Sequence, residues 1–276
     1  MHAILVDKSK RISLDDISTE PPKSLDKDDA NRELAELEEE LSELQELMWG
    51  ARQQGVLIVL QGRDTAGKDG TIKRVVGALN PRGVHVASFG VPTEEELQHD
   101  FLWRIHKHTP RKGELSIFNR SHYEDVLVVR VHGLVPESQW RARYGHILDF
   151  ETMLSQEGSI VLKFFLHISK EEQRKRLIDR EKDPSKAWKL NPNDWKERRY
   201  WSEYSRAYED VFAYTSTDFA PWHVIPADSK WYRNLAVAQA IVRALRPHKD
   251  AWVAELTEKG KLGRAALRSL EERDDT

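Results

Sequence analysis

The sequence contains no cysteine and little methionine, and these shortages exclude several classes of protein. Among 276 residues there are no Cys and only 3 Met. A disulfide framework, a thiolate zinc site and a cysteine nucleophile are therefore excluded. No segment approaches the roughly 18 consecutive apolar residues of a membrane span, and the N-terminus lacks the apolar stretch of a signal peptide. We expect a cytoplasmic protein with no membrane partner.

A strong excess of one charge is also missing. The chain carries 43 Lys and Arg against 46 Asp and Glu, a formal net charge of −3, and charged residues make up 32% of it. This balance predicts no nucleic-acid partner. The hydrophobic fraction of 39% is low for a globular protein but too high for a disordered one, and a chain of this length can bury a core. The question is where the basic residues gather.

Apolar segments of strand length alternate with helical patterns along the chain. Strands are expected over 56–60, 84–89, 115–118, 160–166 and 222–225. Helices are expected over 28–54, 71–79, 94–106, 121–132, 137–155 and 230–245. Continuous apolar runs suit parallel strands that are buried on both faces. The alternation predicts an α/β fold with a five-stranded parallel sheet flanked by helices.

The two ends of the chain are more polar than its middle. Residues 1–27 read as an extended or loosely attached arm, residues 28–248 as one domain, and residues 249–276 as a polar tail with weak helical character. Leucines at three- and four-residue spacing predict that helix 28–54 is amphipathic, with Asp28 or Asp29 as its cap and Gly55 at its end. This helix and the tail either mediate assembly into a homo-oligomer, which we expect, or pack on the core.

A glycine-bearing turn follows the first strand, and it reads G-x-x-x-x-G-K from Gly62 to Lys68. Such a turn between a buried strand and a helix points its amides, the positive end of the helix and a lysine at a phosphate. Asp69 stands where Ser or Thr usually ligates Mg²⁺, so Asp64 is the candidate metal ligand in its place. A turn without a ligand is the alternative.

The third strand ends in Asn119 and Arg120. Ligands bind at the carboxyl edge of such sheets, and an arginine there can fork onto phosphate oxygens. The alternatives are that Arg120 pairs with a structural acid and that Tyr123, which follows it, packs in the core.

Residues 170–206 are basic, with 12 Lys and Arg against 8 Asp and Glu. Arg176 and Arg180 share one helical face, and tryptophans are interleaved with the charges. This composition predicts a mobile helical lid that brings cations over a phosphate site; a solvated helical face is the alternative. A further cation, Arg74, lies on the helix after the glycine turn.

Three motifs together resemble the polyphosphate kinase 2 family. They are G-x-D-x-x-G-K-x-G from Gly62, FNRSHYEDVL from Phe118, and the run from Arg180 through Trp195. The resemblance covers about residues 10–250 and is closest to class III of the family, which accepts both AMP and ADP. It implies a P-loop kinase core similar to thymidylate kinase with a helical lid at about 170–206. It further implies phosphoryl transfer between inorganic polyphosphate and AMP, ADP or ATP with Mg²⁺ (or Mn²⁺).

The resemblance also assigns roles to residues. It implies that the catalytic residues are Asp64, Lys68, Arg120 and Arg180. The phosphate- and nucleotide-binding candidates are Gly62, Ala66, Gly67, Asp69, Gly70, Thr71, Arg74, Asn119, Tyr123, Arg176 and Lys182. Asp64 is the implied metal ligand, and Glu124 and Asp125 are further candidates because Asn119 replaces an aspartate of many members. An ATP-dependent nucleoside or nucleotide kinase and a non-catalytic polyphosphate-binding module remain as alternatives.

Overall fold

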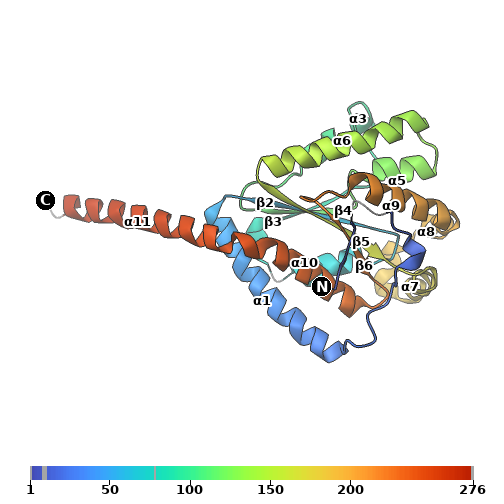
Figure 1. The fold of residues 1–276 in the computed structure, drawn as a ribbon, viewed down its shortest axis with the longest axis horizontal. Coiled ribbons are helices and arrows are strands. Elements are labelled where there is room, and N and C mark those ends of the chain that lie inside the picture. Colours follow the sequence, from blue (N-terminus) through green and yellow to red (C-terminus); the bar gives the residue numbers. More distant parts are fainter. Residues whose placement is uncertain (1, 8–10, 78, 275–276) are drawn as a thin grey trace.

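A six-stranded sheet forms the centre of the computed structural model, which describes residues 2–7, 11–77 and 79–274 (Figure 1). The strand order is β1-β6-β5-β2-β4-β3. The strands are β1 (Ile4–Leu5), β2 (Gly55–Gly62), β3 (Val84–Ser88), β4 (Leu115–Asn119), β5 (Ser159–His167) and β6 (Trp222–Pro226). Strands β2 to β6 pair in parallel, which confirms the five-stranded parallel sheet.

The sixth strand, β1, comes from the N-terminal arm and was not predicted. It pairs antiparallel with β6, and the Val6 amide continues the contact by donating to the Trp222 carbonyl at 2.9 Å. Leu14, in the short 3-10 turn Leu14–Asp16, is 1% exposed. A strand of two residues is too short to show a hydrophobic alternation, so no local pattern predicts it. In the described residues the arm is attached to the sheet.

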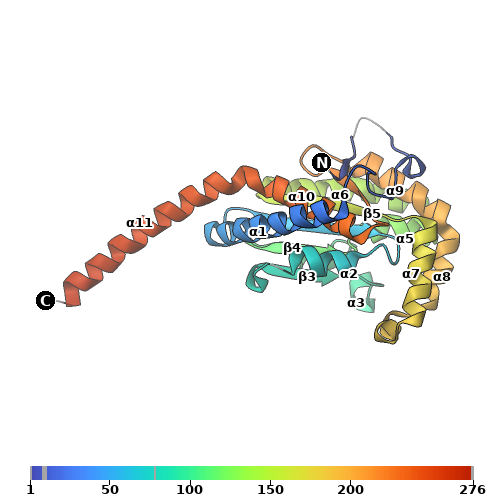
Figure 2. The same cartoon turned by 90° about the horizontal axis from the view of Figure 1, so that it is seen from below.

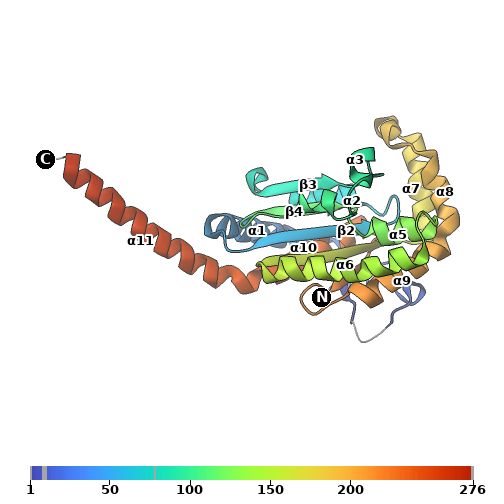
Figure 3. The same cartoon turned by 90° about the horizontal axis from the view of Figure 1, so that it is seen from above.

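Helices cover both faces of the sheet (Figures 2 and 3). One face carries α1 (Lys27–Ala51), α2 (Lys68–Thr71), the π-helical turn Ile72–Val76 and α10 (Lys230–Leu245). The other carries α5 (Glu124–Val131), α6 (Glu137–Gln156) and α9 (Trp201–Thr215). Strand β2 separates the layers, because Val56 and Ile58 join the first core and Leu57 and Val59 the second. Burial on both faces explains its unbroken apolar run.

Several predicted helices differ in their bounds from the observed ones, and two of them show why. Asp26, rather than Asp28 or Asp29, caps α1 by accepting the amides of both, and α1 ends at Ala51 because Arg52 adopts a left-handed conformation (φ 56°). The single helix expected over 94–106 is instead two short ones, α3 (Glu94–Leu97) and α4 (Trp103–His106). Between them the Asp100 carboxylate accepts the Leu102 amide at 2.9 Å, and this local bond competes with helix continuation.

The segment that was predicted to be a lid, which we call the lid segment, and the C-terminal helix lie at opposite ends of the molecule (Figure 1). The lid segment consists of α7 (Lys170–Lys182), the 3-10 helix Pro184–Lys189, α8 (Pro192–Glu197) and the 3-10 turn Arg198–Tyr200. Further 3-10 turns are Pro81–Gly83 and Arg246–His248, and the latter leads into α11 (Lys249–Asp274). Trp252 anchors α11 in the core, whereas Leu262 is exposed. None of the helices in the described part of the chain is long and apolar enough to cross a membrane.

Candidate active site

The glycine turn joins β2 to α2 at the carboxyl edge of the sheet. Gly67 has φ 107°, and a side chain there would overlap with the guanidinium of Arg233, so both the conformation and the space require glycine. Lys68 Nζ donates to the Gly62 carbonyl at 2.8 Å. Burial, followed by the nearby Arg120, lowers the pKa of Lys68. A bound anion would offset both effects, so the turn suits phosphate.

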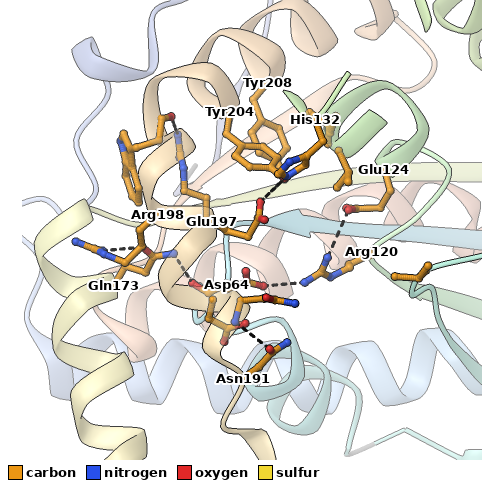
Figure 4. Close-up of a pocket in the computed structure, with 18 residues that line it drawn as sticks. Asp64, Arg120, Glu124, His132, Gln173, Asn191, Glu197, Arg198, Tyr204 and Tyr208 are labelled. Atoms are coloured by element: carbon orange, nitrogen blue, oxygen red, sulfur yellow. Dashed lines mark hydrogen bonds and ion pairs between the residues drawn. The ribbon is translucent and has the colours of Figure 1, made fainter. Parts of the chain in front are cut away.

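Arg120 lies beside this turn, at the end of β4, in a left-handed conformation (φ 61°). Its guanidinium donates to Asp64 at 2.7 Å and to Glu124 at 3.4 Å (Figure 4). The charge of Glu124 is the largest cause that raises the pKa of Arg120. Burial opposes this rise, and the charge of Asp64 adds to it. The structure therefore brings together the predicted strand-end arginine and two predicted metal ligands. A left-handed non-glycine residue costs of the order of 1–3 kcal/mol and often marks a functional site.

Two hollows meet at this point, and they share Asp64, Arg120, Asn191 and Asp194. We call the larger the cationic hollow; it has a volume of about 580 Å³ and lies between the glycine turn, the lid and the start of α10. We call the smaller the aromatic hollow; it has a volume of about 240 Å³ and lies between α5, α9 and the lid (Figure 4). One shared wall thus faces two different environments.

The cationic hollow has an excess of positive charge. Its basic lining residues are Lys68, Arg120, Arg176, Arg180, Lys186, Lys189, Lys230 and Arg233, and its acidic ones are Asp64, Asp69, Asp179 and Asp194. Such a surface attracts a polyanion, even though the whole chain is slightly acidic. The basic residues gather here, which answers the question that the balanced composition raised.

The aromatic hollow offers ring surfaces and paired polar groups. Trp201, Tyr204 and Tyr208 line it from α9. The Tyr204 hydroxyl donates to Glu197 at 2.8 Å, and His132 pairs with the same carboxylate at 2.9 Å. Burial raises the pKa of both tyrosine hydroxyls, so they stay protonated and act as donors. Aromatic faces with hydrogen-bonding groups at their edge suit a base or another planar ligand.

The lid contacts the glycine turn in this structure. Arg176 donates to the carbonyls of Thr65 and Ala66 at 3.1 and 3.3 Å, and Lys189 forms an ion pair with Asp69. This ion pair and, to a smaller extent, a hydrogen bond from Asn119 lower the pKa of Asp69. Asp69, which replaces the usual Ser or Thr, therefore joins the turn to the lid.

Arg180, the predicted lid arginine, points into the cationic hollow with an acidic partner. It donates to Asp194 at 2.8 Å and to the Lys189 carbonyl at 3.0 Å. Burial and the charge of Asp64 raise the pKa of Asp194, so the two carboxylates repel each other across the shared wall. A cation between them would relieve that repulsion.

The donor set fits a divalent metal that is shared with phosphate. Among the described residues no cluster of three or more His, Asp or Glu could hold a metal by itself. Mg²⁺ is usually bound through one or two carboxylates, with waters and substrate phosphates completing its shell. Asp64 meets this requirement, and Asp194 is a second carboxylate beside it that the sequence did not suggest.

The structure divides the predicted site residues into three groups. The cationic hollow is lined by Asp64, Gly67, Lys68, Asp69, Gly70, Asn119, Arg120, Arg176 and Arg180. The aromatic hollow is lined by Gly62 and Glu124, in addition to the shared Asp64 and Arg120. Neither hollow is lined by Ala66, Thr71, Arg74, Tyr123, Asp125 or Lys182.

Three residues of the last group need correction. Tyr123 is fully buried and its hydroxyl donates to Glu151 at 2.7 Å, so it belongs to the core, as the alternative held. Asp125 pairs with Arg143 at 3.2 Å and with Arg104 at 3.7 Å and lines neither hollow, so it is a structural acid and not part of the phosphate site. Arg74 turns toward α1 and pairs with Glu38 at 3.1 Å.

Other lining residues escaped the sequence analysis. Lys186 and Lys189 lie within the basic segment and the motif that runs from Arg180 through Trp195, but no role was predicted for either. Lys230 and Arg233 lie on α10, far from the turn in sequence, and no local signal links them to it. Trp201, at the start of α9, belongs to a stripe that is typical of an ordinary packed helix face.

The fold and the site define the class of protein. The chain has a mainly parallel sheet, a glycine turn with a lysine before the next helix, and an arginine at the end of a neighbouring strand. These are features of a P-loop kinase fold, and the chain is an enzyme. The family model for "Polyphosphate kinase 2 (PPK2)" matches residues 24–251. The chain belongs to the polyphosphate kinase 2 family.

Individual relatives agree with this assignment. The chain is 57% identical over 212 residues to an AMP/ADP-polyphosphate phosphotransferase of Meiothermus ruber, covering 77% of this chain and 79% of that protein. It is 42% identical over 226 residues to an ADP-polyphosphate phosphotransferase of Rhodopseudomonas palustris, covering 78% of each. The crystal structure of polyphosphate kinase 2 from Arthrobacter aurescens TC1 superposes with a TM-score of 0.83 at 45% identity, covering 86% of both chains.

Proposed function

We propose that this protein transfers phosphoryl groups from inorganic polyphosphate to AMP and ADP, forming ADP and ATP, in a reversible reaction that needs Mg²⁺. The observation that carries the proposal is the pair of hollows that share Asp64 and Arg120. Polyphosphate fits the cationic hollow and the nucleotide fits the aromatic one. The names of the relatives from Meiothermus and Rhodopseudomonas support the same substrates.

The chemistry is an in-line displacement at phosphorus. An oxygen of the acceptor's terminal phosphate attacks the last phosphorus of the polyphosphate chain, and the bond from that phosphorus to the bridging oxygen breaks. A polyphosphate chain shorter by one unit leaves with the electron pair. The acceptor oxygen is already anionic, so no general base is needed, and catalysis consists of alignment and charge stabilisation.

Each residue of the shared wall has a part in this step. Lys68 and Arg120 stabilise the charge on the transferring group, and Arg180 approaches it from the lid. Asp64 would hold Mg²⁺, which when bound neutralises phosphate charge. The lid segment excludes water, because hydrolysis would consume the donor without forming ATP.

The two alternative functions receive less support. A nucleoside kinase that uses ATP needs a second base pocket on the donor side, but the described residues that line the cationic hollow include one aromatic ring, Trp188, which is 79% exposed. A non-catalytic polyphosphate-binding module would not need the second, aromatic hollow. Both observations favour the phosphotransferase.

Three further expectations stay predictions. They are the division into an arm (1–27), a phosphotransferase domain (28–248) and a tail (249–276), the homo-oligomeric state, and the cytoplasmic location. Nucleic acid is not an expected partner.

One assay tests the proposal. The purified protein is incubated with Mg²⁺ and polyphosphate plus AMP or ADP, and in parallel with ATP plus nucleosides. We expect ATP to form from polyphosphate and ADP, and ADP to form from polyphosphate and AMP. Phosphorylation of nucleosides by ATP, with no ATP from polyphosphate, would overturn it.

A further inference from the structure

A group of charged and polar side chains lies in the core between β5, α6 and the segment that follows β4. Lys163, on β5, and Glu151, on α6, form an ion pair at 2.6 Å. Lys163 also donates to the Thr215 carbonyl at 2.6 Å. We call Lys163, Glu151, Tyr123 and His122 the buried network. All four are 0% exposed, so none of them is accessible to a substrate in this structure.

Stability alone does not explain this network. The penalty for removing both charges of a buried ion pair from water can exceed their attraction, and apolar residues of similar volume often stabilise a fold as well or better. Lys163 lies among rings, with its ammonium 5.5 Å from the centre of Trp222. Glu151, however, accepts the Tyr123 hydroxyl at 2.7 Å and lies 3.4 Å from His122 Nε2. The informative feature is therefore what the ion pair holds in place.

Tyr123 and His122 belong to the segment that directly follows Arg120. Arg120 has a left-handed backbone (φ 61°), and a non-glycine residue keeps this conformation only where the surrounding structure fixes it. On its amino side, β4 pairs with β2, and the Arg120 amide donates to the Leu60 carbonyl at 3.1 Å. On its carboxyl side the chain leaves the sheet, and the contacts of Tyr123 and His122 with Glu151 fix it there.

A second set of contacts fixes the same segment from the side of the glycine turn. Ser121 Oγ accepts the side-chain amide of Gln61 at 3.0 Å and the backbone amide of Tyr123 at 3.1 Å. Ser121 and Gln61 are both 0% exposed, and Gln61 directly precedes Gly62, where the turn begins. Segment 120–123 is thereby attached to β5 and α6 through the buried network and to β2 through Gln61.

We propose that Tyr123, held by Glu151 and Lys163, is a positioning residue that fixes the guanidinium of Arg120 at the wall shared by the two hollows. This inference rests on the proposed function, in which Arg120 stabilises the transferring phosphoryl group. The buried network binds no substrate and acts only through the backbone of segment 120–123. Stabilisation of a transition state depends steeply on the placement of the donor, whereas attraction of a polyanion depends mainly on its charge.

A double-mutant cycle separates positioning from a merely structural role. Tyr123→Phe removes the hydroxyl that donates to Glu151 and keeps the ring in the core. We expect kcat for ATP formation from polyphosphate and ADP to fall about 10-fold, with little change in either KM, since a displacement of about 1 Å can lower a rate by up to about 100-fold. In an Arg120→Ala background the same substitution should have no further effect on kcat, because residues that act through one contact are not additive.

Two further variants complete the design. Tyr144→Phe is the matched control, because Tyr144 is also a buried tyrosine, its hydroxyl accepts a hydrogen bond from Arg130 at 3.5 Å, and it lines neither hollow. It should leave kcat unchanged. Ser121→Ala is taken through the same cycle and should also lower kcat only while Arg120 is present. It provides the same test if Tyr123→Phe does not fold.

The cycle has outcomes that would overturn the inference. An equal loss of kcat in the unaltered and the Arg120→Ala backgrounds would mean that Tyr123 affects catalysis without Arg120. A folded Tyr123→Phe variant with normal kcat would show that the hydroxyl positions nothing. If the unaltered protein makes no ATP from polyphosphate and ADP, the proposed function fails instead, so the two failures are distinguishable.

Discussion

The cationic and the aromatic hollow share four lining residues, but they differ in charge and in aromatic content. The cationic hollow is lined by eight Lys and Arg against four Asp. The aromatic hollow has three Arg against four Asp and Glu, together with three aromatic rings from α9. Under the proposed function, this difference predicts that the donor is recognised by charge, which tolerates any phosphate of a repetitive chain, and the acceptor by shape and stacking, which do not.

The largest effect should come from the lysine of the glycine turn. Lys68→Ala removes the charge that we propose stabilises the transferring phosphate, and we expect kcat to fall by about 10²–10³-fold, the cost of removing one transition-state donor. The melting temperature should change little, because within the described residues the hydrogen bonds of the ammonium go to the Gly62 and Arg63 carbonyls. Lys73→Ala is the matched control, and a Lys68→Ala variant with normal kcat would contradict the role of the turn.

A substitution in the shared wall should change the KM values for both substrates. Arg120→Ala removes a guanidinium that lines both hollows, so we expect a loss of about 10²-fold in kcat and higher KM values for polyphosphate and ADP. Arg120→Lys keeps the positive charge but loses the planar guanidinium that can donate two hydrogen bonds to one phosphate, so it should recover part of kcat. A change in one KM alone would show that Arg120 belongs to a single hollow.

The aromatic hollow can be altered separately. Trp201→Ala removes a ring that lies 3.9 Å from the Arg63 guanidinium and lines only this hollow. We expect the KM for ADP to rise about 10-fold, in keeping with the 1–3 kcal/mol that base stacking contributes, while the KM for polyphosphate stays the same. Equal increases in both KM values would contradict the separation of the two sites.

Asp125 provides the smallest kinetic effect, because it is adjacent to Glu124 in sequence but outside both hollows. Burial raises its pKa to about 6, against the opposing effects of Arg143 and Arg104. The folded state therefore binds this proton more tightly than the unfolded state, and the buried charge costs stability as pH rises from about 4 through 6. We expect normal kinetics for Asp125→Asn.

The stability of that variant is the informative quantity. Its free energy of unfolding, relative to the unaltered protein, should improve by about 2–3 kcal/mol between pH 4 and pH 7.5, since one pKa unit corresponds to about 1.4 kcal/mol. Denaturant unfolding at the two pH values measures the difference. If the difference in free energy of unfolding does not vary with pH, Asp125 does not titrate with a raised pKa.

The parts of the fold that could be predicted are those with a local signal. Strand β2 contains a continuous apolar run because both of its faces are buried, and the glycine turn is a contiguous motif. Strand β1 was missed because its two residues carry no pattern, and its existence depends on pairing with β6. The break between α3 and α4 was missed because one side chain, Asp100, decides it.

The site residues that could be predicted are also those with a local sequence signal. Asp64, Lys68 and Arg120 were found because they end strands or follow glycines, and the structure brings them together. Tyr123 was misplaced because its position in a motif does not show which way its side chain points. Arg233 was missed because it reaches the turn from a helix whose own sequence is that of an ordinary amphipathic segment.

The central claim is that donor and acceptor occupy the two hollows at the same time. Initial rates measured while polyphosphate and ADP are varied together test it most directly. Simultaneous occupation predicts double-reciprocal lines that intersect, because the phosphoryl group passes straight across the wall at Asp64 and Arg120. Parallel lines, the pattern of a covalent phospho-enzyme made in one hollow and used in the other, would contradict the account.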